Sequence, residues 1–430
     1  MKVAVVGLWH LGTVTAACLA GNGVTTVGID DDAEVVAKLN AGEPPLYEPG
    51  LAELVREGLA AGRLSFAPDP AMVATPDVFW ICHDTPVDDD DQADVEAVFS
   101  RVVALFPLFK DGAVVLVSAQ LPVGTVARLE NSFAAQANGR EVDFACSPEN
   151  LRLGRALEIF RNPGRIVIGV RGQRARDKLS PLLSKFCANL IWMSVESAEM
   201  VKHSLNAFLA LSVTFTNELA TIAERLGANA ADIEKGLRSD PRIGPHAYVK
   251  AGSAFAGGTL ARDVQFLSAM ARREKLQTPL IANIVESNRV HGQWPINQLR
   301  RRLTPLAGKT IAVLGLSYKP GTDAVRRSPA IELLRALLAE GAKIRAYDPA
   351  VRKLPDQFQA GVVMADDAKG ALAGAAAVVI ATEWPQFREL GADDFIRGMQ
   401  GRLVLDPTAF LSPEISGNPA LTVASIGRAA

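Results

Sequence analysis

The chain has 430 residues, of which 49% are hydrophobic and 21% charged, and its formal net charge is −2. This length predicts two or three domains, and the near-neutral charge excludes a general attraction to nucleic acid or to anionic membrane surfaces. No apolar run in the sequence has the length that a membrane span requires. The four cysteines are widely spaced, which excludes a C-x-x-C pair and favours a globular protein of the reducing cytoplasm without a bound metal.

The first 190 residues alternate strand-like apolar runs with helix-like segments. The runs are rich in Val and Ile, and they occupy residues 3–7, 24–30, 78–83, 113–118, 142–147 and 165–170. A helix is expected from Leu11 to Asn22, directly after the first run. Runs that are apolar throughout and are separated by helices predict a parallel sheet covered on both sides.

The middle of the chain has a different pattern. Residues 197–226 show helical periodicity without proline or glycine, and Gly227 follows as a C-terminal cap. This predicts one long helix in an all-helical region, residues 191–295. Residues 292–309 read as a polar connection. A second α/β unit, residues 305–430, then begins near residue 310 and has later strands at 342–348, 375–382 and 402–407. The predicted fold is therefore two Rossmann-like α/β domains (residues 1–190 and 305–430) joined by a central helical domain.

The segment "VVGLWHLG" (5–12) lies where such a fold places its phosphate loop. Gly7 and Gly12 frame the loop, and Asp30 ends the next strand, where an acidic residue accepts hydrogen bonds from the adenosine ribose. No arginine nearby would accept a 2′-phosphate, so NAD is favoured over NADP. Trp9, however, stands at the middle glycine position, where the backbone approaches the pyrophosphate. Three interpretations are open: a cofactor held further out, an indole turned away from it, or a unit that has lost its dinucleotide.

Several stretches in chain order resemble the UDP-glucose/GDP-mannose dehydrogenase family. They are "PPLYEPGLAELV" (44–55), "TP" (85–86), "LPVGT" (121–125), "SPENLRLGRAL" (147–157), "SAEMVKHSLNAF" (197–208), "DPRIG" (240–244), "GLSYKPGTDAVRRSPAIELL" (315–334) and "ATEWPQF" (381–387). The resemblance implies an enzyme that oxidises the carbon-six alcohol of a nucleotide sugar to a carboxylate with two NAD. It also implies that the first domain holds NAD, that the last holds the nucleotide, and that the long helix forms a homodimer.

The same resemblance assigns site residues. Lys202 and Asn206, four residues apart on one helix face, would point into the sugar pocket, Asp263 would orient Lys202 and a water, and Glu149 would assist proton transfer. Arg242 would reach the substrate of a partner subunit. The positions assigned to the cofactor are Gly7, Trp9, Leu11, Gly12, Asp30, Thr85, Pro86, Arg262 and Arg326. Those assigned to the substrate are Glu149, Leu151, Lys202, Asn206, Arg242, Tyr248, Gly257 and Lys319.

The chain also departs from the family pattern around the second oxidation. Thr259 stands where the family has the cysteine whose thiolate attacks the aldehyde, and a threonine hydroxyl is a far poorer nucleophile. Gln120 replaces a threonine that positions water, and Leu153 replaces a second glutamate. Ala254 and Ala256 replace two glycines of the family's loop, and an arginine that the family has after its last strand is replaced near Thr408. Cys146 is a weak candidate for a substitute nucleophile, because a small buried thiol is more often a core residue.

Three functions remain open at this point. We expect an NAD-dependent dehydrogenase, with UDP-glucose as the default substrate, that either stops after a two-electron oxidation or reaches the acid through a bound aldehyde hydrate. A catalytically silent nucleotide-sugar-binding protein is the second possibility. The third is an epimerase or lyase that keeps its NAD and releases no net NADH.

Overall fold

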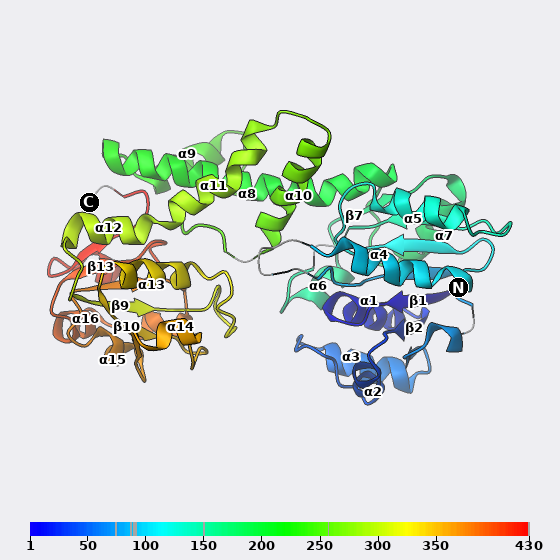
Figure 1. Ribbon diagram of the computed structural model, residues 1–430, viewed down its shortest axis with the longest axis horizontal. Coiled ribbons are helices and arrows are strands. Elements are labelled where there is room, and N and C mark those ends of the chain that lie inside the picture. The colour runs from blue at the N-terminus through cyan, green and yellow to red at the C-terminus, as the bar shows by residue number, and fades with distance from the viewer. Residues whose placement is uncertain (74, 87, 89–92, 149–150, 257, 429–430) are drawn as a thin grey trace. The chain divides into compact units, whose positions relative to one another are not determined.

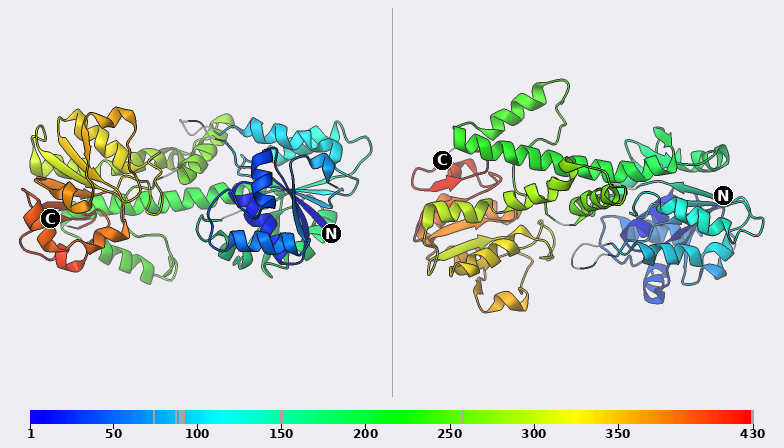
Figure 2. Two further views of the ribbon diagram at one scale, coloured as in Figure 1. Left: turned by 90° about the horizontal axis from the view of Figure 1, so that it is seen from below. Right: turned by 45° about the horizontal axis from the view of Figure 1, so that its top comes forward.

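A computed structural model describes the whole chain except residues 74, 87, 89–92, 149–150, 257 and 429–430 (Figure 1). The described residues divide into two units, Met1–Leu205 and Asn206–Ala430. The boundary falls inside helix α8 (Val195–Leu226), which is a single unbroken helix (Figure 2). Two Rossmann-like sheets and a long central helix are as predicted, while the division into three domains at residues 190 and 305 stays a prediction.

The first unit is built on an eight-stranded sheet with the order β3-β2-β1-β4-β5-β6-β7-β8. Its strands are β1 (Lys2–Val6), β2 (Thr25–Ile29), β3 (Leu64–Ala67), β4 (Val78–Ile81), β5 (Val114–Val117), β6 (Asp143–Cys146), β7 (Ile166–Gly169) and β8 (Leu190–Met193). All neighbours are parallel except β6 and β7, which meet antiparallel at Cys146 and Gly169. The expectation of a fully parallel sheet is therefore wrong at this pair. A parallel neighbour needs a crossover connection that returns the chain to the end of the sheet where the first strand began. The connection between β6 and β7 contains only the six-residue helix α6 (Ala156–Arg161), which packs against α1.

Helices cover both faces of this sheet. They are α1 (His10–Gly21), α2 (Ala33–Asn40), α3 (Leu51–Ala60), α4 (Val95–Ala104), α5 (Thr125–Ala134), α6 and α7 (Gln173–Leu183), with short 3-10 turns η1 (Pro70–Met72) and η2 (Phe106–Leu108). The side chains of β1 alternate between two cores: Val3 and Val5 belong to one, and Ala4 and Val6 to the other. This alternation explains why the first strand is apolar at every position.

The second unit joins helices to a smaller sheet. After α8 come α9 (Ala230–Ser239), α10 (Thr259–Arg273), α11 (Pro279–Gly292) and α12 (Trp294–Leu303). Six parallel strands follow in the order β11-β10-β9-β12-β13-β14. These are β9 (Thr310–Leu314), β10 (Lys343–Tyr347), β11 (Val362–Met364), β12 (Ala377–Ile380), β13 (Leu403–Leu405) and β14 (Thr422–Ala424). Their helices are α13 (Pro329–Ala339), α14 (Asp356–Gln359), α15 (Ala368–Leu372), η3 (Pro385–Glu389), α16 (Ala392–Gly398) and α17 (Pro413–Ser416).

Helix α12 corrects the prediction of a polar connection at residues 292–309. Pro295 stands in the first turn, where a proline is tolerated, and Trp294, Ile296 and Leu299 are buried. The run of three arginines that follows concealed this apolar face in the sequence. Among the described residues, no helix combines the length and the apolar character needed to cross a membrane.

Candidate active site

The first phosphate loop is shaped by two glycines that its packing requires. Gly7 has φ +91°, and a Cβ atom there would lie 2.7 Å from Nδ1 of His83 and 2.8 Å from its backbone nitrogen. A Cβ atom at Gly12 would collide with the carbonyl oxygen of Gly7. The glycines thus let helix α1 start directly against the strand end, which is the arrangement that presents a helix N-terminus to a pyrophosphate.

Trp9 occupies the N-cap position of α1 in an ordinary extended conformation, φ −77° and ψ −150°. The residue therefore has no backbone strain, and it is 47% exposed rather than packed into the core. An indole has no hydrogen-bond acceptor, so Trp9 cannot cap the first N–H groups of the helix, and the first turn holds no acidic residue. Donors at the start of α1 with no anionic side chain in their own turn fit a phosphate ligand.

Asp30 lies directly after β2 and touches the same loop. Its Oδ2 accepts a hydrogen bond of 2.6 Å from the Leu8 backbone N–H, and its Oδ1 accepts one of 3.1 Å from Asp32. The carboxylate is only half-buried, which leaves lone pairs to accept ribose hydroxyls. The NAD that the sequence predicts therefore fits the donors and acceptors of this loop. Leu11, also assigned to the cofactor, packs in the core of the unit.

His10 and Glu48 join the phosphate loop to two other segments, and neither residue was predicted from the sequence. Glu48 is 4% exposed, and its carboxylate accepts hydrogen bonds of 2.7 Å from the N–H groups of Gly154 and Ala156. Nε2 of His10, the first residue of α1, lies 3.1 Å from the same carboxylate. One acidic group thus ties helix α1 to the segments around 48 and 155. The one sequence signal for Glu48 was its place in "YEPG", within the stretch 44–55 that resembles the family.

A small pocket at the carboxyl end of β5 brings together two of the predicted catalytic residues, Gln120 and Lys202. Its lining includes Gln120, Cys146, Glu199 and Lys202, and the space open to the centre of a water-sized sphere is about 20 Å³. This is room for one water molecule. Thr85 belongs to the same corner, since its hydroxyl donates a 2.7 Å hydrogen bond to the carbonyl oxygen of Gln120. The structure therefore brings Thr85, Gln120 and Lys202 together.

Cys146 shares this pocket but does not have the properties of a nucleophile. It is 5% exposed, and burial raises the pKa of its thiol well above the usual value. Reactive cysteines have a lowered pKa and partial exposure. All four cysteines are free and buried.

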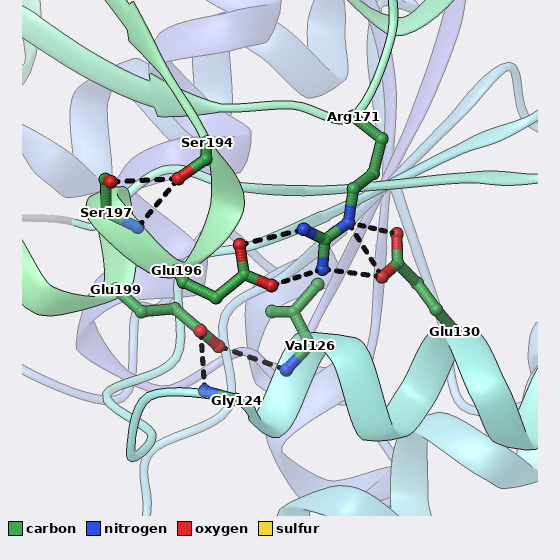
Figure 3. Close-up of polar contacts among 8 residues, drawn as sticks. All are labelled: Gly124, Val126, Glu130, Arg171, Ser194, Glu196, Ser197 and Glu199. Atoms are coloured by element: carbon green, nitrogen blue, oxygen red, sulfur yellow. Dashed lines mark hydrogen bonds and ion pairs between the residues drawn. The ribbon is translucent and has the colours of Figure 1, made fainter.

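Glu199 fixes the start of helix α8 against helix α5. Its carboxylate accepts hydrogen bonds of 2.8 Å from Gly124 N–H and 3.0 Å from Val126 N–H, at the first turn of α5 (Figure 3). Burial raises the pKa of this carboxyl group, although the two N–H donors oppose that shift. Close by, Arg171 bridges Glu130 and Glu196, the latter also on α8. Lys202 lies one turn after Glu199, so these contacts set its position.

In the second unit, α8 continues to Asn206, which is paired with α10. The Asn206 amide group donates a short hydrogen bond to Oδ2 of Asp263, and Asp263 is fully buried. Thr259, the first residue of α10, lies one turn before Asp263 and is exposed. Arg262, on the same helix, is half-buried. The pairing of Asn206 with Asp263 was not predicted as a contact, although both residues were assigned to the site.

The loop that leads to Thr259 is held by its neighbours. The Gly252 N–H donates to the side chain of Asn217 (2.9 Å), and Nε2 of His291 lies 2.8 Å from the Gly252 carbonyl oxygen. The Asn288 side chain bonds both the N–H and the carbonyl oxygen of Phe255, at 2.9 and 3.0 Å. Gly252 and Phe255, which precede α10 in the chain, are therefore anchored on both α8 and α11.

The remaining assigned residues either make other contacts or lie outside the described part of the chain. Arg242 pairs with its neighbour Asp240 at 2.7 Å, and Tyr248 is 59% exposed. Pro86 and Arg326 are exposed, Leu151 and Lys319 are half-buried, and the Lys319 ammonium lies 5.5 Å from the ring centre of Tyr318. Glu149 and Gly257 are among the residues that the structure does not describe. The roles of all these residues stay predictions.

Fold and phosphate loop together define a dinucleotide-binding dehydrogenase scaffold. The sequence matches three domain models of the UDP-glucose/GDP-mannose dehydrogenase family: the NAD binding domain over residues 1–187, the central domain over 196–290 and the UDP binding domain over 312–413. The chain belongs to this family, and it is accordingly an NAD-dependent oxidoreductase that acts on CH–OH groups of a nucleotide sugar.

Individual relatives extend over the full length of the chain. The UDP-glucose 6-dehydrogenase of Pseudomonas aeruginosa is 32% identical, covering 100% of this chain and 98% of the relative. That of Rhizobium meliloti is 34% identical, with 100% of both chains covered. Among solved structures, the UDP-glucose dehydrogenase of Pyrobaculum islandicum has a TM-score of 0.86 at 32% identity and covers 100% of this chain and 98% of its own. The UDP-D-ManNAc dehydrogenase of Pyrococcus horikoshii has a TM-score of 0.84 at 26% identity and covers 100% and 99%.

Proposed function

We propose that the chain oxidises the carbon-six alcohol of a nucleotide sugar, with UDP-glucose as the default substrate. The observation that carries the proposal is the arrangement along α8: Lys202 lines a water-sized pocket, and Asn206, one turn later, bonds the buried Asp263. Relatives named as UDP-glucose 6-dehydrogenases support the choice of sugar. Because the fold also resembles that of an enzyme named as a UDP-D-ManNAc dehydrogenase, acetamido sugars belong among the candidate substrates to be tested.

The cofactor would be held by the first phosphate loop, with Asp30 at the ribose and the N-terminus of α1 at the pyrophosphate. NAD held there would supply the acceptor for the hydride that leaves the sugar carbon. The Lys202 ammonium stabilises the negative charge that develops on the sugar oxygen as its proton leaves. Asp263 accepts a hydrogen bond from the Asn206 amide N–H. This bond leaves the side-chain carbonyl oxygen of Asn206 to accept from another donor, and we assign that donor as a sugar hydroxyl.

The second oxidation is where this chain would differ from the family pattern. Thr259 is exposed at the start of α10, and a hydroxyl there is a weak nucleophile at neutral pH. Cys146 is too buried to act as the nucleophile in place of the family's cysteine thiolate. The water-sized space beside Lys202 and Gln120 favours a route in which water adds to the aldehyde and the hydrate is oxidised. If that route is slow, the reaction stops at the aldehyde after one hydride transfer.

The test is an incubation of the full chain with NAD and a panel of UDP-, GDP- and dTDP-sugars, in which NADH is counted per sugar and the product is weighed by mass spectrometry. Two NADH with an acid product support the hydrate route, and one NADH with a carbonyl product supports a truncated reaction. K202A should lower turnover by about 10²–10⁴-fold. Absence of NADH with every sugar would refute the dehydrogenase proposal and favour the silent binder, or the epimerase if NAD co-purifies.

We also propose a homodimer through α8. Phe208, Phe215 and Ile222, spaced by seven residues, are 65%, 50% and 55% exposed, so one stripe of this helix leaves large apolar side chains uncovered. F215D should convert a dimer to a monomer in sedimentation velocity. R225Q, near the end of the same helix but not apolar, is the matched control. A wild-type monomer at micromolar concentration would refute the dimer. The four free, buried cysteines support a reducing compartment such as the cytoplasm.

A further inference from the structure

Four arginines line a pocket in the second unit, and none of the residues that line it is assigned to the active site. The pocket lies where the end of α8, one face of α12 and the segment after β14 meet, and its lining includes Arg225, Arg301, Arg302 and Arg428. The space open to the centre of a water-sized sphere is about 230 Å³. Since one water needs about 10–15 Å³ on this measure, the pocket has room for a ligand of many atoms.

The carboxylate in this lining, that of Glu224, is occupied by uncharged donors. It accepts hydrogen bonds from Nε1 of Trp294 (2.8 Å), Nε2 of Gln298 (3.2 Å) and the backbone N–H of Gly427 (2.9 Å). None of the ion pairs among the described residues joins Glu224 to an arginine. The pocket therefore keeps a clear excess of positive charge.

On helix α12, the excess of positive charge is confined to the face that lines the pocket. Its three consecutive arginines point in different directions: Arg300 pairs with Glu340 through Nε at 2.7 Å, whereas Arg301 and Arg302 line the pocket. Nε of Arg302 donates to the Gln298 side-chain oxygen at 3.2 Å. Within the described part of the chain, Arg301 has no carboxylate partner. Arg300 is thus a built-in control for its two neighbours.

The third wall of the pocket is fixed in place by backbone contacts. The carbonyl oxygen of Gly427 accepts a 2.8 Å hydrogen bond from Ala230, and Arg428 forms a β-bridge with Asn229. Arginines at the ends of α8 and α12 would also stabilise those helix dipoles, but Arg428 belongs to no helix. Convergence of guanidinium groups from three separate segments is better explained by a shared anionic ligand.

We propose that this pocket binds a small multiply charged phosphate anion of the di- or triphosphate class. Guanidinium groups match phosphate oxygens in bidentate pairs, and several of them around one space favour a ligand with more than one negative charge. Inorganic pyrophosphate and the phosphate chain of a nucleotide share this chemistry.

The experiment is calorimetric titration of pyrophosphate, and separately of ATP, into the full chain at about 0.15 M salt, where exposed charges are screened beyond about 8 Å. The variants are R301Q/R302Q, R225Q and the control R300Q. Binding of pyrophosphate at the first phosphate loop is common to all four proteins and cancels in the comparison. We expect R301Q/R302Q to weaken pyrophosphate binding at least tenfold, R225Q to weaken it severalfold, and R300Q to leave it unchanged.

The two ligands distinguish the sources of the anion. Equal affinity and equal variant losses for ATP and pyrophosphate indicate that the phosphate chain alone is recognised, and tighter ATP binding with the same losses indicates a nucleotide. The same pyrophosphate affinity in wild type and all variants, or no binding at millimolar concentration, would overturn the proposal. If R301Q/R302Q does not fold by circular dichroism, R225Q, which changes an exposed side chain, decides the result.

Discussion

Gly7 and Gly315 occupy the same place in two different sheets. Each follows the central strand, β1 or β9, where the strand order reverses, and their φ angles are +91° and +92°. Each N–H group bonds the last residue of the next strand, Ile29 at 2.9 Å or Tyr347 at 2.8 Å. In both, the following leucine N–H then donates to an aspartate, Leu8 to Asp30 and Leu316 to Asp348, at 2.6 and 2.7 Å.

The two aspartates differ in how much of their capacity is used. Asp30 is half-buried and accepts two backbone N–H groups. Asp348 is 1% exposed and accepts from the Leu316, Ser317, Ala350 and Val351 N–H groups, the Ser317 hydroxyl and Nε1 of Trp384. A carboxylate with six donors has no lone pairs left for a ribose. The same arrangement therefore leaves Asp30 able to accept further hydrogen bonds, as the proposed NAD site requires, whereas Asp348 is fully used in holding its own loop together.

The largest expected difference follows from these aspartates. D348N should lower the free energy of unfolding by about 4 kcal/mol, because several buried donors lose their acceptor. D30N should cost about 1 kcal/mol but weaken NAD binding by about ten- to a hundredfold, since charged hydrogen bonds to the ribose are lost. Urea denaturation and NAD titration of both variants measure this. If D348N weakens NAD binding as much as D30N does, the division of roles is wrong.

The two glycines should behave alike where the aspartates do not. G7A and G315A would each place a Cβ atom within 3 Å of a neighbour, His83 or Thr382, at a left-handed φ. We expect each to lower the free energy of unfolding by about 3 kcal/mol through strain and overpacking. Gly23, also left-handed but with open space around its Cβ position, is the control, and G23A should cost about 1 kcal/mol. Chemical denaturation checks the three variants.

A third difference lies in the residue that faces each glycine. His83 is 8% exposed, and burial lowers its pKa to about 4, whereas Thr382 does not titrate. Because the unfolded state binds a proton more tightly, the contribution of neutral His83 to stability is full above about pH 6.5 and is lost as pH falls toward 4. Between pH 7 and pH 5 the first unit should lose about 2 kcal/mol.

H83T, which copies the second sheet, should remove that part of the pH dependence while T382S leaves it unchanged. Denaturation of the full chain at pH 7, 6 and 5, followed separately for the two units by hydrogen exchange, measures the effect. An unchanged pH slope in H83T would show that His83 is not its source.

The smallest effect concerns Trp9, whose counterpart in the second loop is the buried Ser317. Trp9 is exposed and unstrained, so W9G should change NAD affinity by no more than about threefold, below about 1 kcal/mol. W9S makes the loops alike and should behave in the same way. A tenfold gain in NAD affinity for W9G would mean that the indole obstructs the pyrophosphate.

The sequence predicts the sheets well because their strands are buried on both faces. Val3 to Val6 are apolar at every position, and a short run of this kind next to a glycine turn is typical of a central parallel strand. Helix α12 was missed because Arg300, Arg301 and Arg302 make its sequence look like a linker, although only one side of the helix is polar. Strands β3, β8, β11 and β14 were missed because runs of three or four residues such as "LSFA" are too short to show a periodic pattern.

The site was predicted as a set of residues rather than as contacts. Resemblance to a family identified Lys202, Asn206 and Asp263, yet the bond between Asn206 and Asp263 spans 57 positions, and no local pattern encodes it. His10 and Glu48 were overlooked for the same reason. His10 contacts Glu48 across 38 positions. The other partners of Glu48, Gly154 and Ala156, contribute only backbone N–H groups, which any residue other than proline would provide.

The boundary between the two units lies inside helix α8, with Leu205 on one side and Asn206 on the other. Domains are usually separated at an exposed linker that a protease can cut and an engineer can shorten. Here a break at that point would strip four carbonyl groups and four N–H groups of their partners. Limited proteolysis should therefore spare this junction, and either half expressed alone would need the whole of α8. New chain ends, whether for circular permutation or for expression of a fragment, therefore belong in the loops outside α8.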